Sequence, residues 1–359
     1  MEKNNNQGFQ SEKRSCGMKK HIITALTGAA LVLSLLTGCQ GSTSVPSEQT
    51  PPAEAKKPEE FGVYDMAYVL STRDEYLEVL EKCVLESAYD NCITMEEYYA
   101  GEDSEKMISC IEKAREAGKQ AVLINLIASE DAPACIKAAG DMKVVFINRL
   151  PDDFSILGEN AAAVSSNEYA AGVYQGQFLA EYFKYMGKDT ISYVLFRGTE
   201  GLVHTDLRTD GALDALEAAG FTLEQAAVVH ANYDRLTARD AFADLIPGLE
   251  FDCIISNNDA MALGAIASLE NAGIDPSSIP IVGIDATEDG KKAIRKGEMA
   301  MTVFQSAYGQ ANASIIAAIN MLENVNIAEG TECDISSKSK YVLYYPYVPV
   351  TIDNVDSIE

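Results

Sequence analysis

Residues 251–270 read FDCIISNNDAMALGAIASLE. The run 251–256 is mostly apolar and predicts a buried strand, whereas the small and apolar residues after it predict a helix. Asn257, Asn258 and Asp259 stand between the two, and burying such side chains costs free energy unless each finds a hydrogen-bond partner. We expect Asn258 to contact a ligand and Asp259 to cap the helix, and we assign no role to Asn257.

The same alternation of strand and helix extends in both directions. Apolar runs that predict strands lie at residues 61–70, 120–126, 143–149, 161–164, 191–197, 225–230, 251–256, 280–285 and 299–304. Amphipathic segments that predict helices lie between them, for example at 74–87, 105–118, 167–186, 204–219, 235–245 and 308–322. Continuously apolar strands that alternate with helices indicate parallel sheets covered on both faces. So many units fill two doubly wound α/β domains, in which ligands bind at the carboxyl ends of the strands.

The N-terminal residues predict export. From Met18, which is a candidate start, Lys19 and Lys20 precede an apolar run at 22–36 that is short for a membrane span. Leu36-Thr37-Gly38-Cys39 resembles a bacterial lipobox, with Cys39 as the lipidated residue. We therefore interpret 1–38 as an extension and lipoprotein signal peptide, with a plain signal anchor as the alternative. The Pro-, Ser- and Glu-rich run 39–60 is typical of a disordered tether. The expected location is extracytoplasmic, on the cell membrane.

Composition excludes several functions. The formal charge of -26 over 359 residues argues against a nucleic-acid-binding surface. Of the eight cysteines, Cys16 and Cys39 belong to the N-terminal region, and the other six show no CxxC spacing and no histidine cluster. We expect no zinc site and mostly buried free thiols. The three histidines and the lack of any nucleophile or phosphate-binding motif predict that the chain is not an enzyme and needs no cofactor.

Polar and aromatic residues follow most of the predicted strands. These strand-end residues are Asp74, Tyr76, Asn148, Arg149, His204, Asp206, Arg208, Tyr233, Asn257, Asn258, Asp259, Asp285 and Gln305. Sugar hydroxyls both donate and accept, and planar carboxylate, amide and guanidinium groups bind them in pairs. The C–H faces of a sugar ring pack on aromatic rings. Taken singly, Asp74 and Asp259 also fit helix-terminal roles and Tyr76 fits ordinary packing, but the shared position predicts a sugar site.

Three motifs carry a family resemblance. ISNNDAMALGAI at 255–266, IPIVGIDA at 279–286 and TVFQSAYGQA at 302–311 resemble the galactose/glucose-binding proteins of sugar ABC importers, in the type I periplasmic-binding superfamily. The similarity runs over residues 64–350. It implies two Rossmann-like lobes joined by three crossovers at a hinge that closes around one sugar. It implies an N-terminal lobe of 61–164 plus 305–340 and a C-terminal lobe of 165–304 plus 341–359.

The resemblance also implies the ligand contacts. The family's sugar-contacting positions fall on Asp74, Tyr76, Asn148, Arg208, Tyr233, Asn258, Asp285 and Gln305, with Arg149 and His204 as further candidates. Tyr76 and Tyr233 take the places of the family's aromatic pair. Leu202 and His204 replace a His and an Asp of the family pattern, so a carboxylate acceptor is lost. The family's calcium loop is absent from residues 184–192, and no metal is expected.

The resulting prediction is a monomeric, lipid-anchored binding protein for a galactose- or glucose-like monosaccharide. It would deliver the sugar to the permease subunits of an ABC importer, because contacts of the ligand to both lobes favour the closed state. The changes at Leu202 and His204 keep a pentose, a nucleoside or an autoinducer open as ligands. A surface sensor that feeds a chemoreceptor or a sensor kinase stays open as well. A DNA-binding repressor with the same fold is disfavoured by the lipobox.

Overall fold

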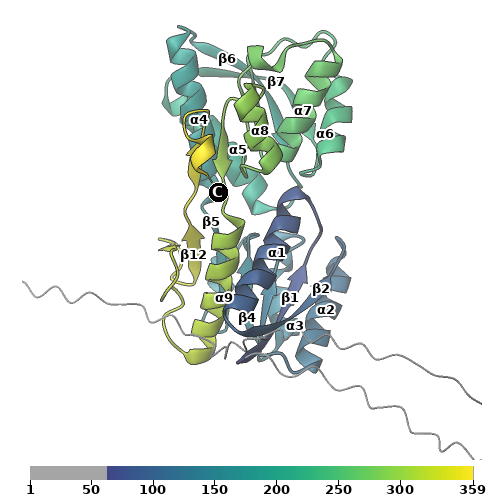
Figure 1. Ribbon diagram of the computed structural model, residues 1–359, viewed down its shortest axis with the longest axis vertical. Coiled ribbons are helices and arrows are strands. Elements are labelled where there is room, and N and C mark those ends of the chain that lie inside the picture. The colour runs from purple at the N-terminus through teal and green to yellow at the C-terminus, as the bar shows by residue number, and fades with distance from the viewer. Residues whose placement is uncertain (1–62, 359) are drawn as a thin grey trace, which may run out of the picture. The chain divides into compact units, whose positions relative to one another are not determined.

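The computed structural model describes residues 63–358. The expected signal peptide, the lipobox cysteine Cys39 and the tether 39–60 therefore lie outside the described residues. Within 63–358 the chain forms two α/β lobes, each built around its own sheet (Figure 1). No helix in this range combines the length and apolar content needed to cross a bilayer.

The first lobe contains a seven-stranded sheet in the order β11-β12-β5-β4-β3-β1-β2, parallel except for β11. Its strands are β1 (Tyr64–Leu70), β2 (Ile93–Tyr99), β3 (Ala121–Ile124), β4 (Lys143–Ile147), β5 (Ala161–Ser166), β11 (Asp334–Ile335) and β12 (Val342–Tyr345). The sequence pattern did not predict β2. This edge strand, ITMEEYY, has mostly exposed and half-buried side chains, so it lacks the continuous apolar run of its neighbours.

Helices cover both faces of the first sheet. One apolar core lies beneath α1 (Glu75–Asp90) and α9 (Ala307–Glu323), and includes Tyr68 of the sheet and Leu80 of α1. The other core lies beneath α2 (Ser104–Glu116) and α3 (Ala132–Ala139), and includes Phe146. Both faces are therefore buried, as the unbroken apolar strands required.

The second lobe has a four-stranded parallel sheet in the order β7-β6-β8-β9. Its strands are β6 (Thr190–Arg197), β7 (Thr222–His230), β8 (Cys253–Ser256) and β9 (Ile281–Val282). A separate antiparallel pair, β10 (Thr302–Phe304) and β13 (Val348–Val350), is bridged to the segment after β9 through Asp285 and Phe304.

Among residues 63–358, five helices flank the second sheet. α4 (Glu168–Tyr185) and α5 (Val203–Ala218) contribute to the core on one face, and α6 (Arg235–Ala243), α7 (Asp259–Asn271) and α8 (Glu288–Lys296) to the core on the other. Glycines bring α4 and α5 close together, since a Cβ at Gly172 would overlap the backbone oxygen of Arg208. This close packing places the start of α4 against the buried side chain of Arg208.

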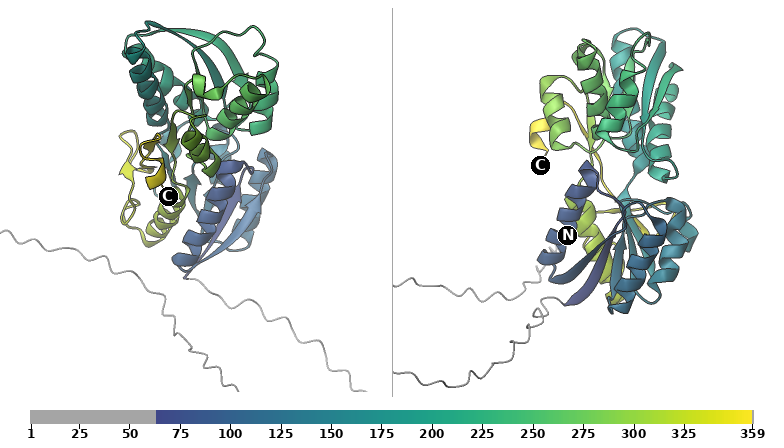
Figure 2. Two further views of the ribbon diagram at one scale, coloured as in Figure 1. Left: turned by 45° about the horizontal axis from the view of Figure 1, so that its top comes forward. Right: turned by 90° about the vertical axis from the view of Figure 1, so that its right-hand side faces the viewer.

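Three chain segments connect the lobes, between β5 and α4, between β10 and α9, and between β12 and β13 (Figures 1 and 2). The α/β prediction with two parallel-sheet lobes is confirmed. One predicted boundary is wrong, because it gave residues 341–359 to the second lobe. Val342–Tyr345 pairs in parallel with β5 and so belongs to the first sheet. The chain enters the second lobe only afterwards, where Val348–Val350 pairs with β10.

Five cysteines of the described part, Cys83, Cys110, Cys135, Cys253 and Cys333, are free thiols. Cys110, Cys135 and Cys253 are buried in the cores, while Cys83, Cys92 and Cys333 are half-buried. Burial raises the pKa of Cys135 to about 12 and also raises that of Cys253, so both remain protonated. The expectation of free thiols is confirmed for Cys83, Cys110, Cys135, Cys253 and Cys333.

Candidate functional site

All ten candidate ligand residues line one small cavity between the lobes. These are Asp74, Tyr76, Asn148, Arg149, His204, Arg208, Tyr233, Asn258, Asp285 and Gln305, and Leu77 completes the wall. They come from both lobes and from the crossover before α9. The fold thus brings together positions that are up to 231 residues apart in the chain, from Asp74 to Gln305. The structure therefore gathers the whole predicted set. Their contact with a ligand stays a prediction.

Asp74 has two roles in the geometry. Its Oδ1 accepts hydrogen bonds from the backbone N–H groups of Tyr76 at 3.0 Å and Leu77 at 2.7 Å, which makes it the N-cap of α1. The same side chain lines the cavity, where its Oδ2 remains available. Burial raises the pKa of Asp74, while the charges of Arg149 and Arg208 oppose that rise.

Two residues after β4 are fixed by buried partners. Asn148 adopts a left-handed backbone (φ 66°), and its Nδ2 donates to Oε1 of Gln310 at 3.2 Å. The Nη1 of Arg149 donates to the hydroxyl of Ser71 and to the carbonyl of Leu126, both at 2.9 Å. These contacts fix the side chain of Arg149, which lines the cavity.

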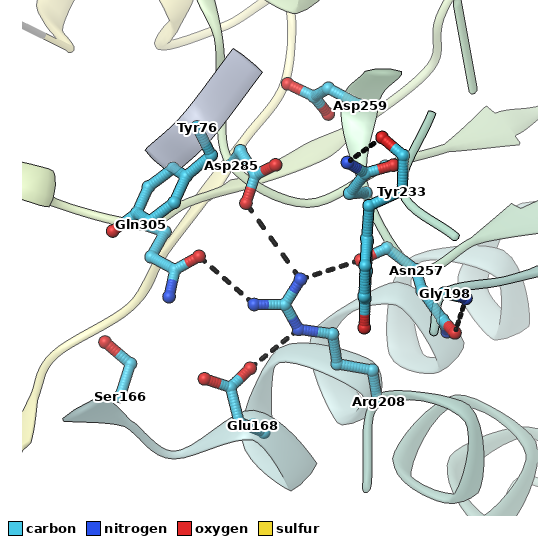
Figure 3. Close-up of polar contacts among 12 residues, drawn as sticks. Tyr76, Ser166, Glu168, Gly198, Arg208, Tyr233, Asn257, Asp259, Asp285 and Gln305 are labelled. Atoms are coloured by element: carbon cyan, nitrogen blue, oxygen red, sulfur yellow. Dashed lines mark hydrogen bonds and ion pairs between the residues drawn. The ribbon is translucent and has the colours of Figure 1, made fainter. Parts of the chain in front are cut away.

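Arg208 is the centre of the polar network (Figure 3). Its Nε donates to Glu168 at 2.6 Å, and its Nη1 donates to the carbonyl of Asn257 at 2.8 Å. Its Nη2 donates to Oε1 of Gln305 at 3.1 Å and to the hydroxyl of Tyr347 at 3.2 Å. The guanidinium is thus held by α4, the β8–α7 loop and two crossovers. Burial lowers its pKa, but the neighbouring groups, Glu168 first, outweigh this and raise the pKa above its usual value, so Arg208 stays charged.

Asp285 is the buried carboxylate with the fewest protein partners in the site. It lies 4.0 Å from Nη1 of Arg208, which is beyond hydrogen-bond distance, and no side-chain hydrogen bond to it is found among residues 63–358. Burial raises its pKa, opposed by Arg208, and Asp259, Asp74 and Glu168 add to the rise. A ligand hydroxyl that donates to Asp285 would supply the missing partner.

At the start of α7, the structure gives Asp259 a different role from the one we predicted. Asn258 is the N-cap of α7, because its Oδ1 accepts from the N–H of Met261 at 3.0 Å. Asp259 is the first helical residue and is fully buried, and its carboxylate accepts from the hydroxyl of Thr302 at 2.6 Å and the N–H of Thr287 at 2.8 Å. The predicted capping role of Asp259 is therefore wrong. It instead ties the start of α7 to β10 and to the loop after β9.

Asn257 and Asn258 each link neighbouring loops. Oδ1 of Asn257 accepts from the N–H of Gly198 at 3.1 Å, and its Nδ2 donates to the hydroxyl of Thr209 at 3.2 Å. Asn257 is fully buried and does not line the cavity, so it braces the loops behind the site. Asn258 lines the cavity as well as capping the helix.

An aromatic pair forms one wall. The imidazole of His204 stacks on the ring of Tyr233, with centroids 5.3 Å apart and planes 22° apart. The Tyr233 hydroxyl is 2.7 Å from that of Thr205, and a side chain at Gly198 would overlap the Tyr233 ring. Burial, and then the charges of Arg208 and Arg149, lower the pKa of His204 well below its usual value, so the imidazole is neutral.

Three residues that line the cavity have strained backbone conformations. Asn148, Tyr233 and Asp285 all have positive φ angles, at 66°, 64° and 119°. Positive φ angles cost free energy in non-glycine residues. Such residues keep these angles only where the surrounding structure fixes the backbone. Strain at three lining residues from three strand ends is typical of a binding site.

Three buried polar atoms of the lining have no hydrogen-bond partner within the described chain. They are the hydroxyl of Tyr76, Nδ1 of His204 and Nε2 of Gln305. An unsatisfied buried polar group costs about 1–3 kcal/mol. Their residues line the same cavity as Asp285 and Arg208, so the site presents unused donors and acceptors together.

The enclosed space is small in this conformation. The cavity has a volume of about 20 Å³, which holds roughly one water molecule. It shares Asp74, Arg149 and Tyr233 with a larger neighbouring cavity of about 660 Å³. A larger ligand therefore requires the lobes or the side chains to move apart.

Sequence reasoning missed Glu168 and Tyr347. Oε2 of Glu168 accepts from Arg208 and from the hydroxyl of Tyr347 at 2.7 Å, and all three side chains are buried. Glu168 follows Asn167, the N-cap of α4, and an acidic residue in a first helical turn carries no signal of its own. Tyr347 lies in a crossover that the sequence did not place. No cluster of metal-binding side chains occurs within the described range.

Comparison with known proteins agrees with this architecture. Residues 69–325 match a family model described as a periplasmic binding protein domain. The D-galactose/methyl-galactoside binding periplasmic protein of Haemophilus influenzae is 32% identical over 250 residues, which cover 66% of this chain and 74% of that protein. A putative rhizopine-binding protein of Rhizobium meliloti is 33% identical over 223 residues, covering 61% and 71%.

Solved structures have the same fold. An ABC transporter solute binding protein from Bacillus halodurans, with bound myo-inositol, aligns with a TM-score of 0.70 and 25% identity over 84% of this chain and 98% of that one. The Caulobacter myo-inositol binding protein aligns with a TM-score of 0.67 and 20% identity over 81% and 95%, which bears on the fold alone. With a family model spanning most of the described residues, and a relative matched over three quarters of its length, the chain belongs to the periplasmic binding protein family.

Proposed function

We propose that this chain is a lipid-anchored extracytoplasmic binding protein that captures a monosaccharide between its lobes and passes it to the permease of an ABC importer. The observation that carries the proposal is the set of unpartnered polar atoms on Tyr76, His204 and Gln305 beside Asp285. A sugar ring offers hydroxyl groups that donate and accept at once, so one ligand can satisfy all of these atoms. The names of the matched galactose- and ribose-binding relatives support a sugar.

The arrangement favours binding by closure of the lobes. Asp74, Tyr76 and Asn148 belong to the first lobe, and Arg208, Tyr233 and Asp285 to the second. A ligand that contacts both sets has a higher affinity for the closed arrangement and shifts the population toward it. Gln305 lies on a crossover, so it reaches the ligand from the hinge itself. Export and anchoring rest on the lipobox sequence at Cys39.

The preferred ligand is a galactose- or glucose-like hexose, bound by the carboxylates of Asp74 and Asp285 and the guanidinium of Arg208. A cyclitol is the second candidate. It is favoured by the myo-inositol bound in a structural neighbour at 25% identity. The two classes share a six-membered ring with vicinal hydroxyls, so this site offers groups for either.

Isothermal titration against a panel of hexoses, pentoses and myo-inositol tests the proposal. We expect one class to bind, and we expect Asp285→Ala and Tyr233→Ala to abolish binding while the circular dichroism spectrum is unchanged. Lys340→Ala is the matched control, because Lys340 lines a separate cavity of about 420 Å³ in the first lobe. Unchanged affinity in both site variants would refute the site, and no heat with any member of the panel would refute the ligand class.

A further inference from the structure

Helix α5 begins without a cap from its own residues. Seven of the nine α-helices among residues 63–358 start at an N-cap residue whose side chain accepts an N–H of the first turn, as Asp103 does for α2. Of the other two, α3 has a proline in its first turn, which has no N–H to satisfy. The N-cap of α5 is Leu202, whose side chain has no acceptor. The first N–H groups of α5 therefore need an acceptor from elsewhere.

An acceptor for α5 comes from the opposite lobe. The N–H of Val203, the first residue of α5, donates to Oγ of Ser129 at 3.2 Å. Ser129 lies in the first lobe, between β3 and α3, and its own N–H donates to the carbonyl of Gly201 at 3.4 Å. These two hydrogen bonds join the loop before α3 to the start of α5. Ser129 is only 2% exposed, so the contact is shielded from water.

We infer that Ser129 is a positioning residue for ligand binding, which caps α5 only when the lobes are closed. His204 directly follows Val203, Arg208 lies one turn further along α5, and both line the small cavity of the predicted site. Ser129 itself lines neither that cavity nor the larger neighbouring one. The inference rests on the proposed function, because it assigns to sugar binding a residue that the sugar does not touch.

The loop that carries Ser129 is fixed within the first lobe. Oδ2 of Asp131 accepts from the hydroxyl of Ser104, the first residue of α2, at 2.7 Å and from the N–H of Ala128 at 3.2 Å. Ser129 therefore has a defined position before the lobes meet, and closure brings the start of α5 to it. A preformed acceptor of this kind loses little conformational freedom when the contact forms.

The start of α5 also forms part of the wall that a ligand would meet. The imidazole of His204 stacks on the ring of Tyr233, and its Nδ1 has no partner within the described chain. Helix ends without a cap fray, and His204 is the second residue of α5. Loss of the Ser129 contact would therefore loosen the imidazole that faces the ligand. It would also remove a contact that favours the closed arrangement.

A double-mutant cycle tests the inference. Ser129→Ala removes the acceptor, and Val203→Pro removes the donor. Proline suits the first position of a helix, and the extended backbone of Leu202, with ψ 118°, suits a following proline. Calorimetry measures the affinity of the four proteins for the tightest-binding member of the panel of hexoses, pentoses and myo-inositol. We expect Ser129→Ala alone to weaken binding about fivefold, as loss of an N-cap would, and to have less than about a twofold effect beside Val203→Pro.

Asp103→Ala is the matched control. It removes a cap within the first lobe, where Oδ1 of Asp103 accepts from the N–H of Lys106 at 3.0 Å. We expect this variant to lower the urea midpoint of the ligand-free protein and to leave its ligand affinity unchanged. Ser129→Ala should do the reverse, because its contact with Val203 is absent when the lobes are apart.

The outcomes separate this inference from the function on which it rests. An unchanged affinity in Ser129→Ala refutes the positioning role and leaves the sugar-binding function standing. An equal loss with and without Val203→Pro also refutes the role, because the effect would then not depend on the N–H of Val203. An equal loss of affinity in Asp103→Ala refutes it as well, because loss of any cap would then weaken binding. No heat with any member of the panel refutes the proposed function and, with it, the role of Ser129.

Discussion

Glu168 and Arg208 form a buried ion pair, with Oε2 of Glu168 2.6 Å from Nε of Arg208 and side-chain exposures of 1% and 5%. The pair joins α4 to α5, and the hydroxyl of Tyr347 donates to the same Glu168 oxygen from the crossover between β12 and β13. The guanidinium that faces the predicted ligand is therefore oriented by groups that the ligand does not touch. Its position depends on the hinge as well as on its own lobe.

Removing the charge of Glu168 should be costly. Glu168→Gln leaves the guanidinium of Arg208 buried without its main counter-charge, and breaking a buried pair costs roughly 3–5 kcal/mol. We expect a loss of this size in the free energy of unfolding, measured by urea denaturation, together with a loss of ligand affinity. Asp356→Asn is the matched control. It breaks the exposed pair with Arg295, at 2.8 Å, and should cost less than about 1 kcal/mol. Equal losses in the two variants would contradict the structural role of Glu168.

The sequence was sufficient to predict the lobes and the lining of the site. Strands buried on both faces are continuously apolar, and parallel topology directs their carboxyl ends to one edge, so Asp285 and Tyr233 could be placed without coordinates. The roles of Asn258 and Asp259 were not decided by local sequence, because both residue types cap helices well. Thr287 and Thr302, 28 and 43 residues further along the chain, bind Asp259 and so leave the cap to Asn258.

Residues with ordinary local patterns were the ones that sequence reasoning missed. Glu168 looks like any first-turn acid, and only the packing of α4 on α5 reveals its partner Arg208. The strand Val342–Tyr345 was assigned to the wrong lobe because a short apolar run does not indicate which sheet the strand joins. In both cases, the role or lobe of a residue depends on a contact with a partner far away in the sequence.

A contact across the mouth of the cleft should favour the closed arrangement. Nη2 of Arg235, in the second lobe, donates to Glu75 of the first lobe at 2.7 Å and to Asp289 of its own lobe at 3.2 Å. These side chains are 31–48% exposed, so we expect Glu75→Gln to cost only ~0.5 kcal/mol, or about a twofold loss of ligand affinity. Calorimetry at low salt measures the loss, and 1 M salt should remove it.

Asp289→Asn provides the control for this contact. It removes the partner of Arg235 within the second lobe and leaves the pair with Glu75 intact. We expect its ligand affinity to match that of the unmodified protein. A weakening as large as that of Glu75→Gln would mean that the charge of Arg235, and not its contact between the lobes, affects binding.

Asp259 should make the free protein less stable as the pH rises. Burial raises the pKa of this carboxyl from 3.8 to about 7, so the folded chain holds the proton more tightly than the unfolded chain. Its contribution to stability is therefore full below pH 4 and is lost between about pH 4 and 7, at roughly 1.4 kcal/mol per unit of pKa difference. Asp259→Asn should flatten this part of the stability curve, measured by urea denaturation at a series of pH values. Asp153→Asn should not, because hydrogen bonds from Ser155 lower the pKa of Asp153 and its contribution is lost only in stronger acid. A curve for Asp259→Asn that keeps the full slope between pH 4 and 7 would contradict the buried, protonated state.

His204 should have the opposite effect. Burial, together with the charges of Arg208 and Arg149, lowers the pKa of its imidazole well below 6.5. As the pH falls below 6.5, His204 therefore becomes protonated in the unfolded chain while it stays neutral in the folded chain. The contribution of His204 is therefore full above pH 6.5 and is lost as the pH falls below that value. His204→Gln should remove this loss in the free protein, which urea denaturation at a series of pH values measures. Parallel curves for His204→Gln and the unmodified protein would contradict the lowered pKa, because they would mean that His204 takes up its proton at the same pH in the folded and the unfolded chain.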